Sequence, residues 1–132
     1  MTPMLASMAA ALVLGLAATT PLDWSRAQTV TVVATEYGFA PSRLTFRVGV
    51  PYRLHLENRG KELHEFTAPA FFQSVKLGNP EVLNADRSEV VLQPGAQQDL
   101  DLVPGQAGRY PFVCADHDWA GMTGEIFVES GG

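Results

Sequence analysis

Alternation of apolar and polar residues along short runs is the feature that most constrains how this chain can fold. Side chains of a β-strand point alternately to opposite faces of its sheet, so each run predicts a strand with one buried face. Turn-forming Gly, Pro and Asn residues separate the runs at spacings of about 8–12 residues, typical of β-sandwiches and barrels. The runs are TVTVVA (29–34), LTFRV (44–48), YRLHLE (52–57), EVVLQ (89–93), QDLDLV (98–103), RYPFVC (109–114) and TGEIFVE (123–129). We therefore predict an all-β domain, an antiparallel sandwich or barrel of about seven or eight strands.

The stretch from residue 68 to residue 88 interrupts this rhythm. Its sequence, APAFFQSVKLGNPEVLNADRS, is longer than a hairpin loop and lacks regular alternation. We expect a short helix or an irregular strand there, with Phe71 and Phe72 burying part of the segment.

An apolar segment of small and aliphatic residues, Met4–Ala18, precedes the predicted strands. It is shorter than the roughly 20 residues of a membrane span and is typical of a secretory signal peptide. The motif SRA at residues 25–27 offers small residues for cleavage, although no Lys or Arg precedes the apolar run. We expect residues 1–27 to be a signal peptide and residues 28–132 to be the mature domain, periplasmic or otherwise exported. Retention of the segment as an uncleaved membrane anchor is the alternative.

Acidic residues outnumber basic ones, and the formal net charge is −5. Residues 28–61 hold five basic and two acidic side chains, whereas residues 62–132 hold three basic and eleven acidic ones. Nucleic-acid binding requires a basic face, so we expect no nucleic-acid partner. The acidic half could attract a basic protein, although scattered surface carboxylates would also explain the pattern.

A set of soft-metal ligands lies in the sequence YPFVCADHDWAGMTGEI, residues 110–126. The only cysteine, Cys114, is followed three residues later by His117 and eight residues later by Met122. Alternation places Cys114 on the inward face at the end of its strand, and Gly121 permits a tight turn in the loop that follows. One cysteine cannot form an internal disulfide, so it is a buried thiol, an intermolecular crosslink, a nucleophile or a metal ligand. A thiolate, imidazoles and a weak thioether together are the ligands of type 1 copper.

Such a site needs a second imidazole, and the chain has two other histidines. His55 alternates with Leu54 and Leu56, so we expect its side chain to face outward from a strand. His64 follows a turn and shares the inward face with Phe66, which would let it reach the rim of the sandwich. His64 is therefore the better candidate.

The motifs CADHDWAGM (114–122) and LHEF (63–66), in an all-β chain, resemble the cupredoxins, the family of plastocyanin and pseudoazurin. The resemblance covers the strand pattern of residues 28–132 and implies a Greek-key β-sandwich that holds one type 1 copper ion. Tyr110 and Phe112 occupy the aromatic positions that precede the family's ligand cysteine. The ligands that the resemblance implies are three equatorial residues, His64, Cys114 and His117, and one axial residue, Met122.

Three positions depart from the family pattern. The family often has Asn after its first ligand histidine and Ser or Thr after its cysteine, and these side chains help to tie the two ligand loops together. Here the residues are Glu65 and Ala115. A proline that is common before the second histidine is replaced by Asp116, which keeps an N–H able to donate to the Cys114 sulfur. The departures leave the ligand types unchanged and bear on the reduction potential and the stiffness of the loop.

The ligand set predicts a one-electron carrier rather than an enzyme. His117 is the expected point of electron exit, and Trp119 beside it is either part of an apolar docking patch or a loop anchor. Asp116 and Asp118 would favour a cationic redox partner such as a cytochrome or a membrane oxidoreductase complex.

We expect a monomer that contacts a membrane only if its N-terminal segment is retained. A copper-sequestering, copper-tolerance or copper-delivery protein would use the same site and is the main alternative to the carrier. An enzyme with Cys114 as nucleophile and His117 as base is a further alternative, without an evident oxyanion arrangement.

Overall fold

The structure of the protein is a computed structural model that describes residues 2–4, 9 and 22–131. The predicted signal segment therefore lies largely outside the described residues. Within the part of the chain that is described, no helix has the length and apolar character needed to cross a membrane.

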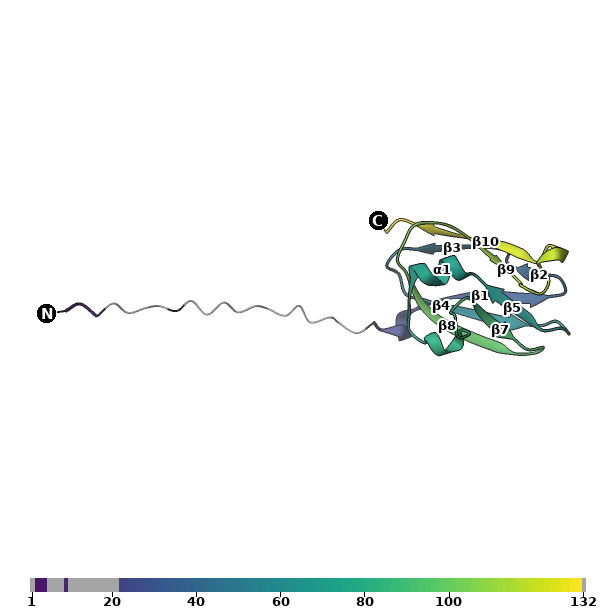
Figure 1. Ribbon diagram of the computed structural model, residues 1–132, viewed down its shortest axis with the longest axis horizontal. Helices are drawn as coiled ribbons and strands as arrows, with labels where there is room; N and C mark the ends of the chain where they lie inside the picture. Colours follow the sequence, from purple (N-terminus) through teal and green to yellow (C-terminus); the bar gives the residue numbers. More distant parts are fainter. Residues whose placement is uncertain (1, 5–8, 10–21, 132) are drawn as a thin grey trace.

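Two five-stranded sheets pack face to face, as Figure 1 shows. The first sheet contains, in spatial order, β2 (Gly38–Ala40), β1 (Gln28–Thr35), β4 (Tyr52–Asn58), β8 (Gln97–Pro104) and β6 (Val75–Leu77). The second contains β3 (Arg43–Arg47), β10 (Thr123–Glu129), β9 (Gly108–Val113), β5 (His64–Thr67) and β7 (Glu89–Leu92). The all-β sandwich predicted from the sequence is confirmed.

The strand count exceeds the sequence prediction because β2 and β6 are only three residues long. A run of that length is too short for alternation to be recognised. The pairing also differs from a wholly antiparallel arrangement, since β1 pairs with β4, and β3 with β10, in parallel. Between β1 and β4 the chain crosses to the second sheet, where it forms β3, and then returns to the first.

Alternation predicts the buried faces well. On β9, Tyr110 and Phe112 are buried, and Cys114, which directly follows the strand, is buried with them. On β4, the apolar residues are buried while His55 and its neighbours on the outer face are partly exposed. The aromatic rings of both sheets meet in the middle of the sandwich, where Phe112 contacts Phe66 and Phe39.

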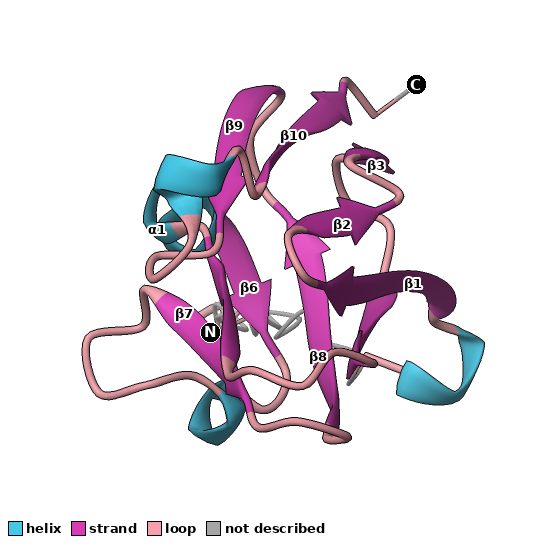
Figure 2. Cartoon of the chain, turned by 90° about the vertical axis from the view of Figure 1, so that its right-hand side faces the viewer, coloured by secondary structure: helices cyan, strands magenta, loops and turns pink. Residues whose placement is uncertain are grey.

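The irregular stretch at residues 68–88 contains both elements that the sequence suggested. A short helix, α1 (Pro69–Ser74), leads directly into β6, and a turn of 3-10 helix, η2 (Pro80–Val82), follows. Phe71 and Phe72 are buried, as predicted. They seat α1 beside β9, as Figure 2 shows.

Candidate metal centre

Cys114 and His64 come together because β9 and β5 are neighbours in the second sheet and run antiparallel. Val113, the last residue of β9, pairs with Thr67, the last residue of β5, so the chain after β9 runs back along β5 toward His64. Phe112 lies two residues before Cys114, and Phe66 lies two residues after His64. Their rings stack with centroids 4.6 Å apart. This stack fixes the spacing of the two strands beneath the site.

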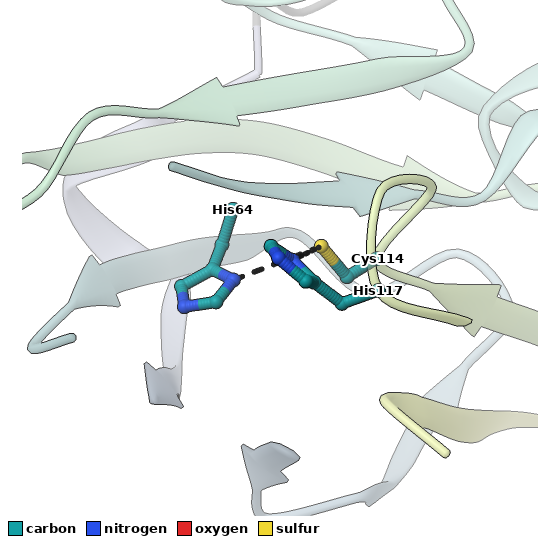
Figure 3. A group of neighbouring side chains, drawn as sticks. All are labelled: His64, Cys114 and His117. Carbon is teal, nitrogen blue, oxygen red and sulfur yellow. Dashed lines mark hydrogen bonds between the residues drawn. The ribbon is translucent and has the colours of Figure 1, made fainter. Parts of the chain in front are cut away.

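Three of the four predicted site residues converge at the rim of the sandwich (Figure 3). The Sγ atom of Cys114 lies 3.7 Å from Nδ1 of His64 and 3.5 Å from Nδ1 of His117. One donor atom from each residue lies within 4.8 Å of the other two. His64 and Cys114 are fully buried, and 13% of the His117 side chain is exposed.

This spacing fits one metal ion held by the three residues. For metal–sulfur and metal–nitrogen bonds of about 2.3 and 2.05 Å, meeting at about 110–120°, the sulfur–nitrogen separation is roughly 3.6–3.8 Å. The separation between Cys114 Sγ and His64 Nδ1, 3.7 Å, lies within that range, and the separation between Cys114 Sγ and His117 Nδ1, 3.5 Å, lies just below it. One thiol and two imidazoles are the strong donors of a type 1 copper centre.

The loop from Cys114 to Met122 is closed by its own backbone. The His117 N–H donates to the Cys114 carbonyl (3.1 Å), and the Cys114 N–H donates to the Met122 carbonyl (3.0 Å). A turn of 3-10 helix, η3 (Asp118–Ala120), ends at Gly121, whose φ of +79° is a left-handed conformation that favours glycine. Met122 is fully buried at the end of this loop, and the axial role of its sulfur stays a prediction.

His55 lies apart from this cluster, as its outward position predicts. Its ring nitrogens contact the carboxylates of Asp99 on the neighbouring strand β8 and of Glu57. Hydrogen bonds with Asp99 and then Glu57 raise the pKa of His55 above its ordinary value. Among the residues that the structure describes, His55 belongs to no group that could hold a metal.

Glu65 is a buried residue of the site that strand alternation does not reveal, because its neighbours His64 and Phe66 are the residues that should point inward. Its N–H donates to Cys114 Sγ (3.4 Å), and its carboxylate accepts from the same thiol (3.1 Å). Burial raises the pKa of Glu65, and Asp116 nearby raises it further. The link between the two ligand loops is thus made by Glu65 directly to the sulfur.

Burial raises the pKa of the Cys114 thiol to about 11. The backbone N–H groups of Glu65 and Asp116 act in the opposite direction, because donors near sulfur favour the thiolate. A hydrogen bond from the Asp116 N–H to the sulfur, which the sequence suggested, stays a prediction. Without a metal the thiol is protonated at neutral pH, so a metal that binds the thiolate must displace this proton.

The outer nitrogens of both site histidines face carboxylates. His64 Nε2 lies 3.2 Å from Oε1 of Glu36, and His117 Nε2 lies 3.7 Å from Oε2 of Glu62. Tyr37 lies over the His117 ring, with ring centroids 4.8 Å apart. Sequence reasoning missed these three residues, since they belong to turns and carry no periodic signal.

Trp119 projects from the loop and does not anchor it on the sandwich. Its side chain is 76% exposed, and its Nε1–H donates to the Asp116 carbonyl (2.9 Å). Its ring centroid lies 6.0 Å from that of Tyr37, which is 42% exposed. Together Tyr37 and Trp119 form an exposed surface beside His117, which we call the aromatic patch.

Comparison with known proteins agrees with this geometry. The family model described as the cupredoxin-like domain matches residues 6–128. This chain belongs to the cupredoxin-like family, and its site is one for a single type 1 copper ion. No curated protein matches its sequence.

Solved structures with the same fold include copper proteins. Auracyanin B is 21% identical with a TM-score of 0.58, and the alignment covers 78% of this chain and 89% of that one. Dithionite-reduced auracyanin from the photosynthetic bacterium Roseiflexus castenholzii is 19% identical with a TM-score of 0.59, over 78% and 98% of the two chains. A copper binding protein in its apo form is 20% identical with a TM-score of 0.55, over 76% and 86%. At identities this low, the structural likeness shows a shared fold and nothing beyond it.

Proposed function

We propose that this protein is an exported one-electron carrier whose copper ligands are His64, Cys114 and His117, with Met122 as a weak axial ligand. The observation that carries the proposal is the convergence of the Cys114 sulfur and two imidazole nitrogens within 4.8 Å of one another. Copper at this point supplies a one-electron couple between Cu(II) and Cu(I). The protein contributes a set of donors whose arrangement is fixed before the metal binds.

Burial and hydrogen bonding support that fixed arrangement. His64 and Cys114 are fully buried, and the Cys114 sulfur accepts a hydrogen bond from the Glu65 N–H. His117 is held between the ring of Tyr37 and the loop that it belongs to. Side chains so confined reorganise little on electron transfer, which favours rapid exchange.

Electrons would leave through His117, because its ring borders the aromatic patch. The patch offers apolar contact area to a partner, and the exposed side chains of Glu62, Asp116 and Asp118 surround His117 with negative charge. This combination favours a redox partner with a cationic rim, such as a cytochrome or a membrane oxidoreductase complex. The apolar segment at residues 4–18 supports an extracytoplasmic location.

The test is stopped-flow oxidation of a reduced cationic cytochrome by the copper-loaded chain. We expect a second-order rate constant that falls as ionic strength rises, because opposite charges steer the encounter. Trp119→Ala should lower this rate by about tenfold, as expected for an exposed aromatic at the centre of an interface. Val91→Ala is the matched control, since Val91 is an exposed apolar residue on β7, and its rate should equal that of the parent.

A different set of results would contradict the role of electron carrier. If cytochrome oxidation is slow and insensitive to Trp119→Ala, and copper instead passes to a metal-free acceptor protein, the site serves copper handling. The visible spectrum should be the same in both variants, so a rate change reports docking and not loss of copper.

A further inference from the structure

We propose that Glu36 is a positioning residue of the copper centre, which holds the His64 ring with its Nδ1 atom toward the metal. The proposal rests on the assignment of His64 as a ligand in the proposed function. Glu36 lies in the turn between β1 and β2, 28 residues before His64 in the sequence.

The Glu36 carboxylate sits in a niche made by the turn between β4 and β5. Its Oε1 atom accepts hydrogen bonds from the N–H groups of Lys61 (2.6 Å) and Glu62 (2.8 Å). Gly60 leaves room for it: a Cβ atom at that position would collide with Oε1 and lie 2.7 Å from Cδ and 2.8 Å from Oε2. Only a glycine at position 60 therefore leaves this space free for the Glu36 carboxylate.

The niche is fixed by Asn58, a buried side chain that braces the same turn. Its Oδ1 atom accepts from the Gly60 N–H (2.9 Å). Its Nδ2 atom donates to the carbonyls of Glu62 (2.8 Å) and Leu92 (2.9 Å). The position of the Glu36 carboxylate is thus set by backbone atoms that are themselves tied to β7.

The remaining contact of Glu36 Oε1 is with His64 Nε2, at 3.2 Å. Because Oε1 already accepts from two backbone N–H groups, it faces the His64 ring as an acceptor. An acceptor at Nε2 requires Nε2 to carry the ring proton, so Nδ1 presents its lone pair beside Cys114 Sγ, 3.7 Å away. Carboxylates behind ligand histidines raise the basicity of the ligand, which favours Cu(II) over Cu(I).

Two variants test this through the tautomer of His64 and through copper affinity. Glu36→Ala removes the carboxylate, and Gly60→Ala leaves it present but displaces it from the niche. Because the added methyl group of Gly60→Ala meets only the end of a flexible side chain, this variant should fold normally. Glu36→Gln, which keeps an acceptor oxygen, is the conservative variant that should restore the tautomer, and Glu81→Gln, at an exposed acid of η2, controls for charge.

Nitrogen-15 NMR of the metal-free full chain should show His64 protonated at Nε2 in the parent. Glu36→Ala and Gly60→Ala should both populate the Nδ1-protonated form. Both should lower the Cu(II) affinity by about 10–100-fold, with a smaller effect on Cu(I). The reduction potential then rises by about 59 mV for each tenfold difference between the two affinities.

The proposal is overturned if the parent carries its His64 proton on Nδ1. It is also overturned if either variant keeps the His64 tautomer of the parent and binds Cu(II) with an affinity within about twofold of the parent's. Parent-like Cu(II) affinity in His64→Ala would instead refute the ligand assignment and with it the proposed function. The tautomer of the metal-free chain bears on Glu36 alone, so the two failures are distinguishable.

Discussion

Gly124→Ala should destabilise the protein strongly, because Gly124 lies beneath the ring that supports the site. Gly124 on β10 pairs with Phe112 on β9. A Cβ atom at position 124 would collide with the Phe112 ring and would lie 2.5 Å from the Ser42 carbonyl oxygen. Neither group can retreat freely, since Phe112 is stacked on Phe66 and the Ser42 carbonyl accepts from the Glu125 N–H (2.8 Å).

The size of the effect follows from these two collisions. Displacing a packed ring by overfilling the core costs about 1–3 kcal/mol. Weakening the hydrogen bond to the Ser42 carbonyl adds about 1 kcal/mol. A loss of about 3 kcal/mol in the free energy of unfolding corresponds to a fall of about 12 °C or more in Tm for a domain of this size.

The assay is urea and thermal unfolding of the copper-free chain, followed by circular dichroism in the presence of a reductant. Copper is omitted because a ligand that binds the folded state would mask the difference. Gly38→Ala is the matched control: a Cβ atom at position 38 has no neighbour within 4 Å, so its stability should stay within about 0.5 kcal/mol of the parent.

A double variant identifies the group responsible. If the Phe112 ring is the obstacle, Gly124→Ala combined with Phe112→Val should be less destabilised than the sum of the two single changes by about 1 kcal/mol or more. A Gly124→Ala protein as stable as the Gly38→Ala control would refute the reasoning, because the close approach of β10 to the Phe112 ring would then be absent.

Three further predictions concern the site and the outer face of β4. Cys114→Ser should abolish the intense visible band of the copper-loaded chain, because the thiolate is the donor in that transition; a blue variant would disprove the ligand. Burial raises the pKa of the Cys114 thiol to about 11, so Cu(II) binding should release about one proton. The Cu(II) affinity should therefore rise about tenfold per pH unit from about pH 7 to about pH 9, and a pH-independent affinity would contradict this. His55→Ala should lower the free energy of unfolding by up to about 1 kcal/mol at pH values below the ordinary His pKa of 6.5. The loss should shrink as the pH rises through the elevated folded-state pKa of His55, because the neutral ring no longer forms ion pairs with Asp99 and Glu57. An equal loss of stability at acidic and alkaline pH would show that these ion pairs do not contribute.

The sequence predicts the fold class and most of the candidate site because both follow from local backbone geometry. Period-two alternation is a property of any strand with one buried face, so it indicates which side chains point inward without reference to the rest of the fold. It places Cys114 inward and His55 outward, and the short loop brings His117 back to the sulfur. The choice of His64 over His55 needed no knowledge of the tertiary structure.

Only the tertiary structure decided three features: the parallel pairs β1/β4 and β3/β10, the burial of Glu65, and the contacts of Glu36 and Tyr37 with the two histidines. Alternation indicates a buried face but not which strand lies beside it, and a turn carries no periodic signal at all. Glu36 reaches His64 because the turn between β1 and β2 meets the turn between β4 and β5 at one end of the sandwich. That meeting depends on strand pairing between distant segments, whose register is set by the packed core as a whole.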